Sequence, residues 1–130
     1  MTYEQACRKI KDHFEALWTD AVPMIYPNEK EDLGDVKRFG RMTIRPASGR
    51  QVAVGGRKHR RQGLTTIQLF VEQGTGVHEV GAMEEMAARI FTDHIVPGIR
   101  FSHVGADRAG NDGYGYYQSN VNASFQFDVK

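Results

Sequence analysis

The first twenty residues alternate apolar and charged positions with the period of an α-helix. Apolar side chains recur there at three- and four-residue steps, at Tyr3, Cys7, Ile10, Phe14, Leu17 and Trp18. Charged residues fill the positions between them, so the pattern predicts an amphipathic helix over residues 3–19. A second helix is predicted over residues 77–94, and Pro97-Gly98 ends it. Its apolar stripe consists of Val80, Met83, Met86, Ala87, Ile90 and Phe91.

Much of the remaining chain alternates with a period of two, which is typical of β-strands. Shorter strands are predicted at residues 39–46, 51–54, 64–73 and 99–104. The longest alternation, residues 116–129, has an apolar face made of Tyr117, Val121, Ala123, Phe125, Phe127 and Val129. Its opposite face is polar and rich in amides: Gln118, Asn120, Asn122, Ser124, Gln126 and Asp128. We expect the apolar face to be buried and the polar face to be solvated or shared with a partner.

The order of these elements predicts a single α+β domain over residues 1–130, with a mainly antiparallel sheet and two helices packed on one of its faces. A chain of this length can bury a hydrophobic core without disulfides or metal ions. A strand of about fourteen residues would reach roughly 45 Å, which exceeds the body of a compact domain of this size. The long C-terminal strand can therefore project, together with the glycine-rich residues 105–115, for which we predict a mobile connection.

Positive charge is concentrated in one short segment, at Arg57, Lys58, Arg60 and Arg61. Removing these four charges from the net charge of +1 leaves −3 for the rest of the chain, which disfavours a generally basic nucleic-acid binder. Neighbouring glycines predict a loop over residues 55–63. Such a basic cluster is often only solvated, but it could also neutralise about four phosphates or meet an acidic partner or a neighbouring copy. Composition leaves these alternatives open.

Motifs for catalysis and cofactor binding are missing from the sequence. None of the histidines has metal-ligand spacing: His13, His59, His78, His94 and His103. Gly74, Gly76 and Gly81 do not form a phosphate loop, and they predict a strand-to-helix turn instead. Residues 107–113 lack calcium-loop spacing and predict a flexible turn. Cys7, the single cysteine, falls in a helical apolar stripe, so we expect a buried thiol rather than a nucleophile, and no enzyme, metal or cofactor.

The sequence also lacks the features of a membrane protein. No apolar run approaches the roughly 20 residues of a membrane span. The first twenty residues are interrupted by charge and lack the apolar centre of a signal peptide. We therefore expect a soluble intracellular protein.

Several stretches in a fixed order carry a resemblance to a known family. They are Trp18, VPMIYPNE at 22–29, GRMTIRP at 40–46, VAVGG at 52–56, Arg61 with GLTTIQLFVEQGTG at 63–76, and YYQSNVNASFQFDV at 116–129. In order and spacing they are similar to the tail terminator, or tail-completion, proteins of long-tailed bacteriophages and prophages. The resemblance covers nearly the whole chain.

This resemblance implies a structural virion protein rather than an enzyme. Such proteins form a ring, commonly of six copies, that caps the head-proximal end of the tail tube and stops its polymerisation. The ring offers a docking face to head-completion or connector proteins, and DNA passes through its channel without sequence specificity. We accordingly expect the protein in the neck region of the virion tail, and in the host cytoplasm during assembly.

In a ring, the basic cluster of six copies would gather about 24 charges, which would create a strong field. Candidate residues for the interface or the DNA channel are Arg57, Lys58, Arg60, Arg61, Tyr116, Gln118, Asn120 and Asn122. One alternative is a stand-alone nucleic-acid-binding module, with Phe70 or Tyr114, Tyr116 and Tyr117 as stacking groups. Another is a different neck or connector protein of the virion.

Overall fold

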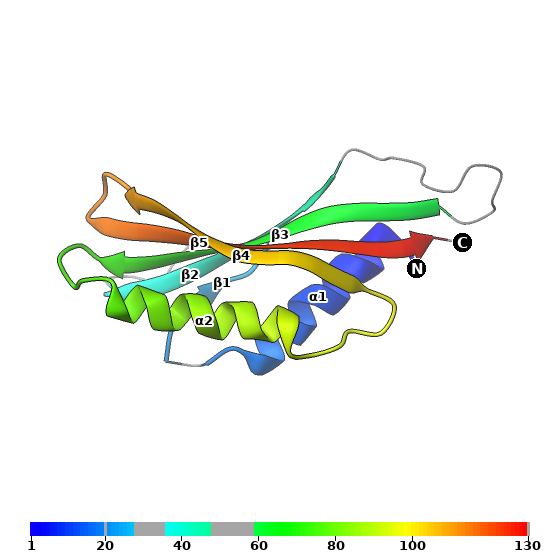
Figure 1. The fold of residues 1–130 in the computed structure, drawn as a ribbon, viewed down its shortest axis with the longest axis horizontal. Coiled ribbons are helices and arrows are strands. Elements are labelled where there is room, and N and C mark those ends of the chain that lie inside the picture. The colour runs from blue at the N-terminus through cyan, green and yellow to red at the C-terminus, as the bar shows by residue number, and fades with distance from the viewer. Residues whose placement is uncertain (20, 28–35, 48–58, 130) are drawn as a thin grey trace.

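The computed structural model describes residues 1–19, 21–27, 36–47 and 59–129 of the chain (Figure 1). Within these residues, two helices and five strands form. The elements in chain order are α1 (Tyr3–Leu17), β1 (Met24–Ile25), β2 (Arg38–Pro46), β3 (His59–Glu72), α2 (His78–Thr92), β4 (Arg100–Asn111) and β5 (Tyr116–Val129). The strands lie in the order β1-β2-β3-β5-β4, and every neighbouring pair is antiparallel except β1 with β2. The predicted α+β class with a mainly antiparallel sheet is confirmed.

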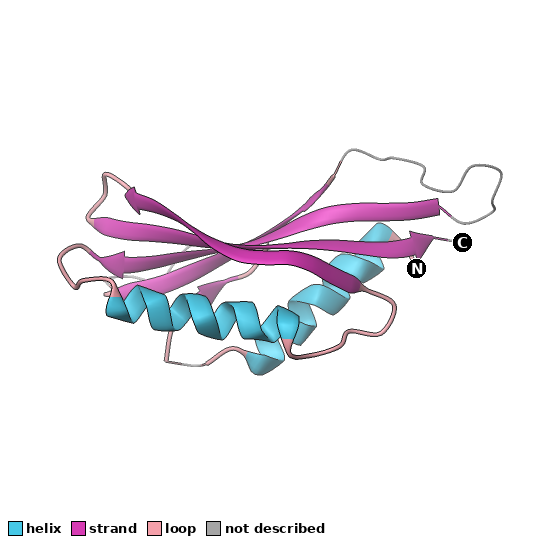
Figure 2. Cartoon of the chain, in the orientation of Figure 1, coloured by secondary structure: helices cyan, strands magenta, loops and turns pink. Residues whose placement is uncertain are grey.

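Both helices lie on the same face of the sheet, as predicted (Figure 2). A capping box starts α1: the Thr2 hydroxyl accepts from the Gln5 backbone N–H, and the Gln5 side chain accepts from the Thr2 N–H. The helix buries Ala6, Ile10 and Phe14 completely. Two members of the predicted stripe are more exposed, since Leu17 is 40% exposed and Cys7 is half-buried.

The second helix follows a turn that requires glycine. Gly74 and Gly76 have φ angles of 87° and 82°, which L side chains rarely adopt, so the predicted strand-to-helix turn is confirmed. The side chains that α2 buries are Val80, Met83, Glu84, Ala87, Ile90 and Phe91. Met86 was expected in this buried stripe but is 39% exposed. A glutamate therefore occupies the buried face of α2.

The core of the molecule lies between the helices and the central strands β3 and β5. These two strands pair over 14 residues, from His59 opposite Val129 to Glu72 opposite Tyr116. Their side chains facing the helices are almost fully buried: Ile67, Leu69, Val71, Val121, Ala123, Phe125 and Phe127. Each large apolar side chain buried in this way contributes about 1.5–3 kcal/mol. The alternation predicted for both strands is confirmed.

The sequence-based boundary of β3 was wrong. Residues 59–63 were expected in a loop, but they belong to β3 and pair with residues 125–129 of β5. Charged residues and glycine have low intrinsic β-propensity, and backbone pairing with β5 overrides it. The predicted return arm at residues 51–54 lies outside the described residues.

The segment after residue 104 was also mispredicted. Residues 105–111 are not a mobile connection but the second half of β4. The pairing of β4 with β5 shifts register between Ser102 and Gly105 and again between Arg108 and Gly110. Gly110 has a φ of 85°, so glycine is used here to build an irregular strand. The turn itself is confined to residues 112–115.

The long C-terminal strand, expected to be able to project, lies inside the sheet (Figure 1). β3 flanks it along its whole length, and β4 flanks it from Tyr117 to Gln126. The outer strands of the sheet are β1 and β4. β5 is therefore not a free arm, and β4 is the longer of the two outer strands.

Gly63 provides a test of how β3 and β5 pack. A Cβ atom at this position would lie 2.6 Å from Phe125 Cε1 and 2.8 Å from the Arg45 carbonyl oxygen. We predict that Gly63→Ala lowers the free energy of unfolding by roughly 1–3 kcal/mol, because the buried ring cannot move away without strain. Urea denaturation measures this change. Gly105→Ala is the control, since a Cβ there meets no atom within 4 Å, and a loss as large as that of Gly63→Ala would contradict the packing explanation.

Candidate interaction surface

The face of the sheet that the helices leave uncovered, called here the open face, has an unusual composition. Side chains of β3 and β5 that point to this face carry no charge from residue 62 to 70 and from residue 118 to 126. We call this set the uncharged band: Gln62, Leu64, Thr66, Gln68, Phe70, Gln118, Asn120, Asn122, Ser124 and Gln126. Exposed strand faces normally carry charged side chains, whereas the centres of protein interfaces are depleted of them.

Side chains of the uncharged band are ordered by bonds among themselves. The Thr66 hydroxyl donates to Asn122 Oδ1 at 2.8 Å, across the β3–β5 pair. Gln118 Nε2 donates to Asn120 Oδ1 at 2.9 Å along β5. Thr66 is only 8% exposed. These two bonds fix the orientation of four amide and hydroxyl side chains within the band.

At one end of the open face, three aromatic rings pack against one another. The rings of Phe39 and Phe70 stack at 4.5 Å, and the Tyr116 ring meets Phe39 edge-on at 5.2 Å. The Tyr116 hydroxyl donates to the Val36 carbonyl at 2.6 Å, and Phe70 is 6% exposed. These rings are therefore poor candidates for stacking on nucleic-acid bases. Tyr114 differs, because it is 88% exposed at the β4–β5 turn.

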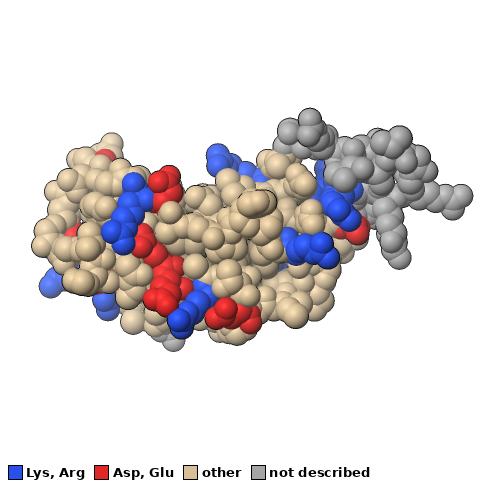
Figure 3. All heavy atoms as spheres, viewed as in Figure 1, with Lys and Arg blue, Asp and Glu red and all other residues tan. Residues whose placement is uncertain are grey.

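The basic cluster does not act as a single surface in its described part. Arg60 and Arg61 are consecutive residues of β3, so their side chains point to opposite faces of the sheet. Arg60 lies on the open face, where its Nε is 3.3 Å from Asp128 Oδ1, and this pair is half-exposed. Arg57 and Lys58 lie outside the described residues. On the view in Figure 3, basic and acidic side chains are interspersed, with no extended surface of one sign.

A partly buried ion pair between Arg108 and Glu84 fastens α2 to the sheet on the helix side. Arg108 of β4 donates from Nε and Nη2 to the two oxygens of Glu84, each at 3.0 Å. The fully buried Ser119 hydroxyl donates to the same carboxylate in a short bond. The Arg108 hydrogen bonds hold the pKa of Glu84 below its usual range, with help from Ser119 and against the effect of burial. Glu84, Arg108 and Ser119 hydrogen-bond to one another and so hold α2 against the sheet. We call these three side chains the Glu84 clamp.

The single cysteine and the histidines offer no chemistry in the described part of the chain. Burial raises the pKa of the Cys7 thiol and also that of the neighbouring Tyr3 hydroxyl, so both groups stay protonated. His13 Nε2 is 2.8 Å from the Ile90 carbonyl oxygen, which fixes the ring between the helices. No group of three potential metal ligands occurs among the described residues.

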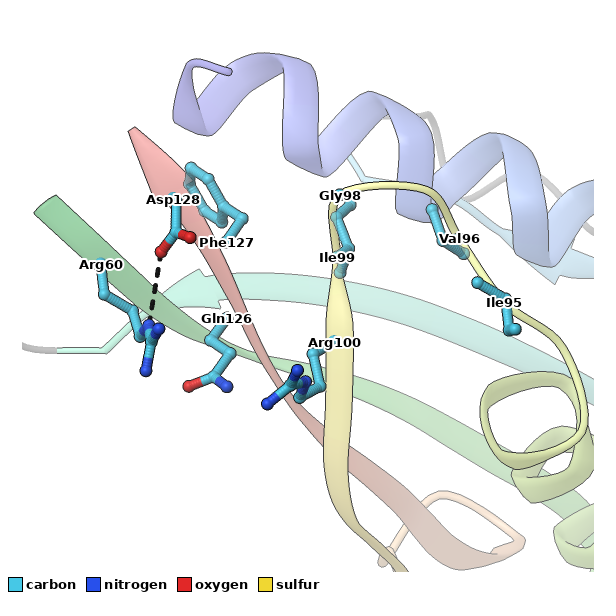
Figure 4. A pocket seen from close by; sticks show the side chains of 9 residues that line it. All are labelled: Arg60, Ile95, Val96, Gly98, Ile99, Arg100, Gln126, Phe127 and Asp128. Carbon is cyan, nitrogen blue, oxygen red and sulfur yellow. Dashed lines mark hydrogen bonds and ion pairs between the residues drawn. The ribbon is translucent and has the colours of Figure 1, made fainter. Parts of the chain in front are cut away.

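A pocket of about 270 Å³ lies at the end of the sheet where β4 begins (Figure 4). Strand pairing explains it: β4 starts at Arg100 opposite Gln126, while β5 continues beside β3 to Val129. The gap left beside the end of β5 is called here the notch. The strands contribute Arg60, Arg100, Gln126, Phe127 and Asp128 to its lining, and the α2–β4 connection contributes Ile95, Val96, Gly98 and Ile99.

Comparison with known families identifies what kind of protein this geometry belongs to. Residues 7–122 match a family model described as phage tail terminator protein. The chain belongs to the phage tail terminator family. Members of this family are structural, non-enzymatic proteins of the virion tail that interact with the tail tube.

Comparison with solved structures shows that the fold of this chain occurs elsewhere. A solved structure that is 15% identical superposes with a TM-score of 0.64 and covers 95% of this chain and 96% of that chain. At this identity the likeness shows a shared fold alone. No curated protein matches the chain. Within the described ranges, no helix is long and apolar enough to cross a membrane.

The structure brings together some of the sequence-predicted site residues of the terminator. Tyr116, Gln118, Asn120 and Asn122 share the open face, and Arg60 lies at its far end. Sequence reasoning missed the contribution of β3, although the alternation of Gln62, Leu64, Thr66 and Gln68 was a usable signal. It also missed the Glu84 clamp, whose signal was a carboxylate inside the apolar stripe of a predicted helix.

The clamp predicts an acid-sensitive stability. Glu84 has a lowered pKa in the folded protein, so its contribution is complete above its ordinary value of 4.5 and is lost as the pH falls through the folded value. We predict that Glu84→Gln lowers the free energy of unfolding at pH 7 by about 1–3 kcal/mol. The difference from the parent protein should shrink below pH 4.5.

Urea denaturation at a series of pH values measures this effect. Glu85→Gln is the matched control, because Glu85 is the next residue of α2 and forms an exposed pair with Arg89 at 2.7 Å. That control should change stability by at most about 0.5 kcal/mol. A Glu84→Gln deficit that stays constant from pH 7 to pH 3 would refute the charge-based explanation.

Proposed function

We propose that this chain forms a closed ring at the head-proximal end of the tail tube, where it ends polymerisation and provides the docking face for head-completion or connector proteins. In this proposal DNA passes through the ring without sequence-specific contacts, and the ring contains six copies. Membership of the tail terminator family supports the location. The observation that carries the assembly is the uncharged band on the open face.

The composition of the band favours contact with protein over contact with water. Five consecutive outward positions on each of the two central strands contain amides, hydroxyls and apolar groups but no carboxylate, ammonium or guanidinium. Burying such groups is inexpensive when each amide finds a partner, whereas burying charged groups would cost several kcal/mol each. A neighbouring copy or the tube end can therefore cover the band, while Arg41 and Arg45 of β2 and Asp107 of β4 lie along its sides.

The open edge of the sheet constrains how copies meet. β4 forms this edge, but its pairing with β5 shifts register twice, and His103 has a φ of 52°. Bulges of this kind twist an edge and oppose the addition of a continuous strand. We infer that copies contact one another through faces and strand ends more than through one long β-ladder along β4.

The basic cluster has a separate role in this proposal: Arg60 and Arg61 point to opposite faces of the sheet, so one can face the channel and the other the tube-docking surface. Arg57, Lys58, Arg60 and Arg61 would repeat around the ring and attract phosphates or acidic protein groups. Because Arg60 is paired with Asp128, its contribution to this field is smaller than a free arginine would make.

Placing a charge in the uncharged band tests the assembly. We predict that Ser124→Lys leaves the subunit folded but lowers the yield of tails joined to heads at least about tenfold, because its strand neighbours Leu64 and Ser102 carry no carboxylate and an interface cannot solvate the ammonium group. The control is Ala82→Lys, an exposed position of α2 that adds the same charge away from the sheet. Electron microscopy of complemented lysates counts the joined virions. Normal joining by Ser124→Lys would remove the open face from the assembly.

Charge reversal tests the basic cluster. The double variant Arg57→Glu with Lys58→Glu and the single variant Arg61→Glu test the cluster apart from Arg60, which also lines the notch. We expect both to form rings, and at least one to lower the yield of joined virions, because reversed charges repel the DNA or the acidic docking surface. If both variants form rings and join tails normally, Arg57, Lys58 and Arg61 have no role in docking.

A further inference from the structure

Two exposed hydrophobic side chains lie at opposite ends of the β4–β5 pair. Ile95 is 90% exposed and Tyr114 is 88% exposed, while the next large hydrophobic side chain of the described residues, Val77, is 49% exposed. Tyr114 lies in the turn between β4 and β5, and Ile95 lies before β4 beside the notch (Figures 1 and 4). Single exposed hydrophobic residues are common on protein surfaces, so these two side chains point to a partner only together with the shape and charge around them.

The turn that carries Tyr114, called here the hairpin tip, is held rigidly. Asp112 Oδ1 accepts from the backbone N–H groups of Tyr114 at 2.7 Å and Tyr116 at 3.1 Å. The Gly115 carbonyl accepts from the Gln73 N–H at 3.1 Å, which ties the tip to the end of β3. Gly113 and Gly115 supply the positive φ angles that the turn requires. An aromatic ring presented on a fixed turn loses little entropy when it binds.

The notch has the mixed chemistry that suits a tyrosine. Ile95, Val96 and Ile99 offer apolar contact for the ring. Arg60 and Arg100 lie on the same side of the sheet with Gln126 between them (Figure 4), so guanidinium groups lie within the lining. Tyrosine has an apolar body and a polar hydroxyl, and its ring face attracts cations.

Simple electrostatics also favours contact between the two ends. The hairpin tip carries one carboxylate, Asp112, and no cation. The charged residues lining the notch are Arg60, Arg100 and Asp128, which give a positive balance. The two ends of one copy therefore attract opposite ends of other copies and repel like ends.

We propose that the hairpin tip of one copy inserts Tyr114 into the notch of the next copy. The contact joins two different surfaces, so it is head-to-tail, and repetition of such a contact closes into a ring when the rotation per copy allows. This inference deepens the proposed ring assembly and rests on it. It assigns the side chains that join neighbouring subunits.

Site-specific photo-cross-linking tests the contact directly. Tyr114 is replaced by p-benzoylphenylalanine, the protein is mixed with tail tubes, and the sample is irradiated and digested for mass spectrometry. We expect cross-links to residues 95–100 or 126–128 of another copy. Cross-links to other segments, or none, overturn the inference.

The same irradiated sample is imaged, so that the two proposals can fail separately. Rings at tube ends without cross-links to the notch would retain the proposed function and remove the tip-to-notch contact. Absence of rings together with absence of cross-links would remove both proposals.

Mixing two defective variants supplies a second, independent readout. Tyr114→Ser removes the aromatic ring from the hairpin tip. The double variant Ile95→Ser with Arg100→Ser removes an apolar and a cationic side chain from the notch. Each of the two should lower the yield of rings about tenfold or more. A mixture of the two variants retains one intact junction per pair, so it should yield dimers but no rings. Val77→Ser is the control for removal of an exposed hydrophobic group. Full ring formation by either defective variant would overturn the inference.

Discussion

The pairing register of β3 and β5 is the constraint on which the rest of this structure depends. Side chains alternate between the two faces, so a slip of one residue would exchange the buried and open faces of both strands. In the observed register, Ile67 and Val121 face the helices, while Thr66 and Asn122 face outward and bond to each other. The apolar face recruits α1 and α2, which supply most of the remaining core. The same register determines which side chains form the open face, because the residues of β3 and β5 that do not face the helices must point to the other side of the sheet.

That coupling connects folding to function. Substitutions of the core residues lower the stability of the domain, whereas the open face can carry side chains suited to a partner at little cost to the fold. In this tail terminator it carries an ordered, uncharged band with a packed aromatic group at one end. Catalytic sites depend on perturbed groups in a pocket, whereas here the groups with a shifted pKa are Glu84 and Arg108 of the clamp and the neighbouring Tyr3 and Cys7 of α1. The protein acts through surfaces, and the activity we propose belongs to an assembly of copies.

Sequence patterns predicted the elements whose apolar residues recur with a regular period. Both helices, the apolar faces of β3 and β5 and the bounds of β5 followed from spacing alone. Residues 59–63 and 105–111 could not be predicted as strands, because arginine, glycine and aspartate have weak β-propensity and adopt strands here only through pairing with β5. The same limitation explains why the candidate site could be predicted only in part. Neighbouring charges at Arg60 and Arg61 looked like one cluster in the sequence but separate onto two faces once the strand is recognised. The notch depends on where β4 begins relative to the end of β5, which no local pattern encodes.

Electron cryomicroscopy of tail tubes assembled with this protein would show where the chain sits and what covers its open face. We expect density at one end of each tube, arranged as a closed ring in which the open faces of all copies contact neighbouring protein. Density along the tube wall, filaments of protein on DNA, or end-bound copies whose open faces remain in solvent would contradict the proposed ring.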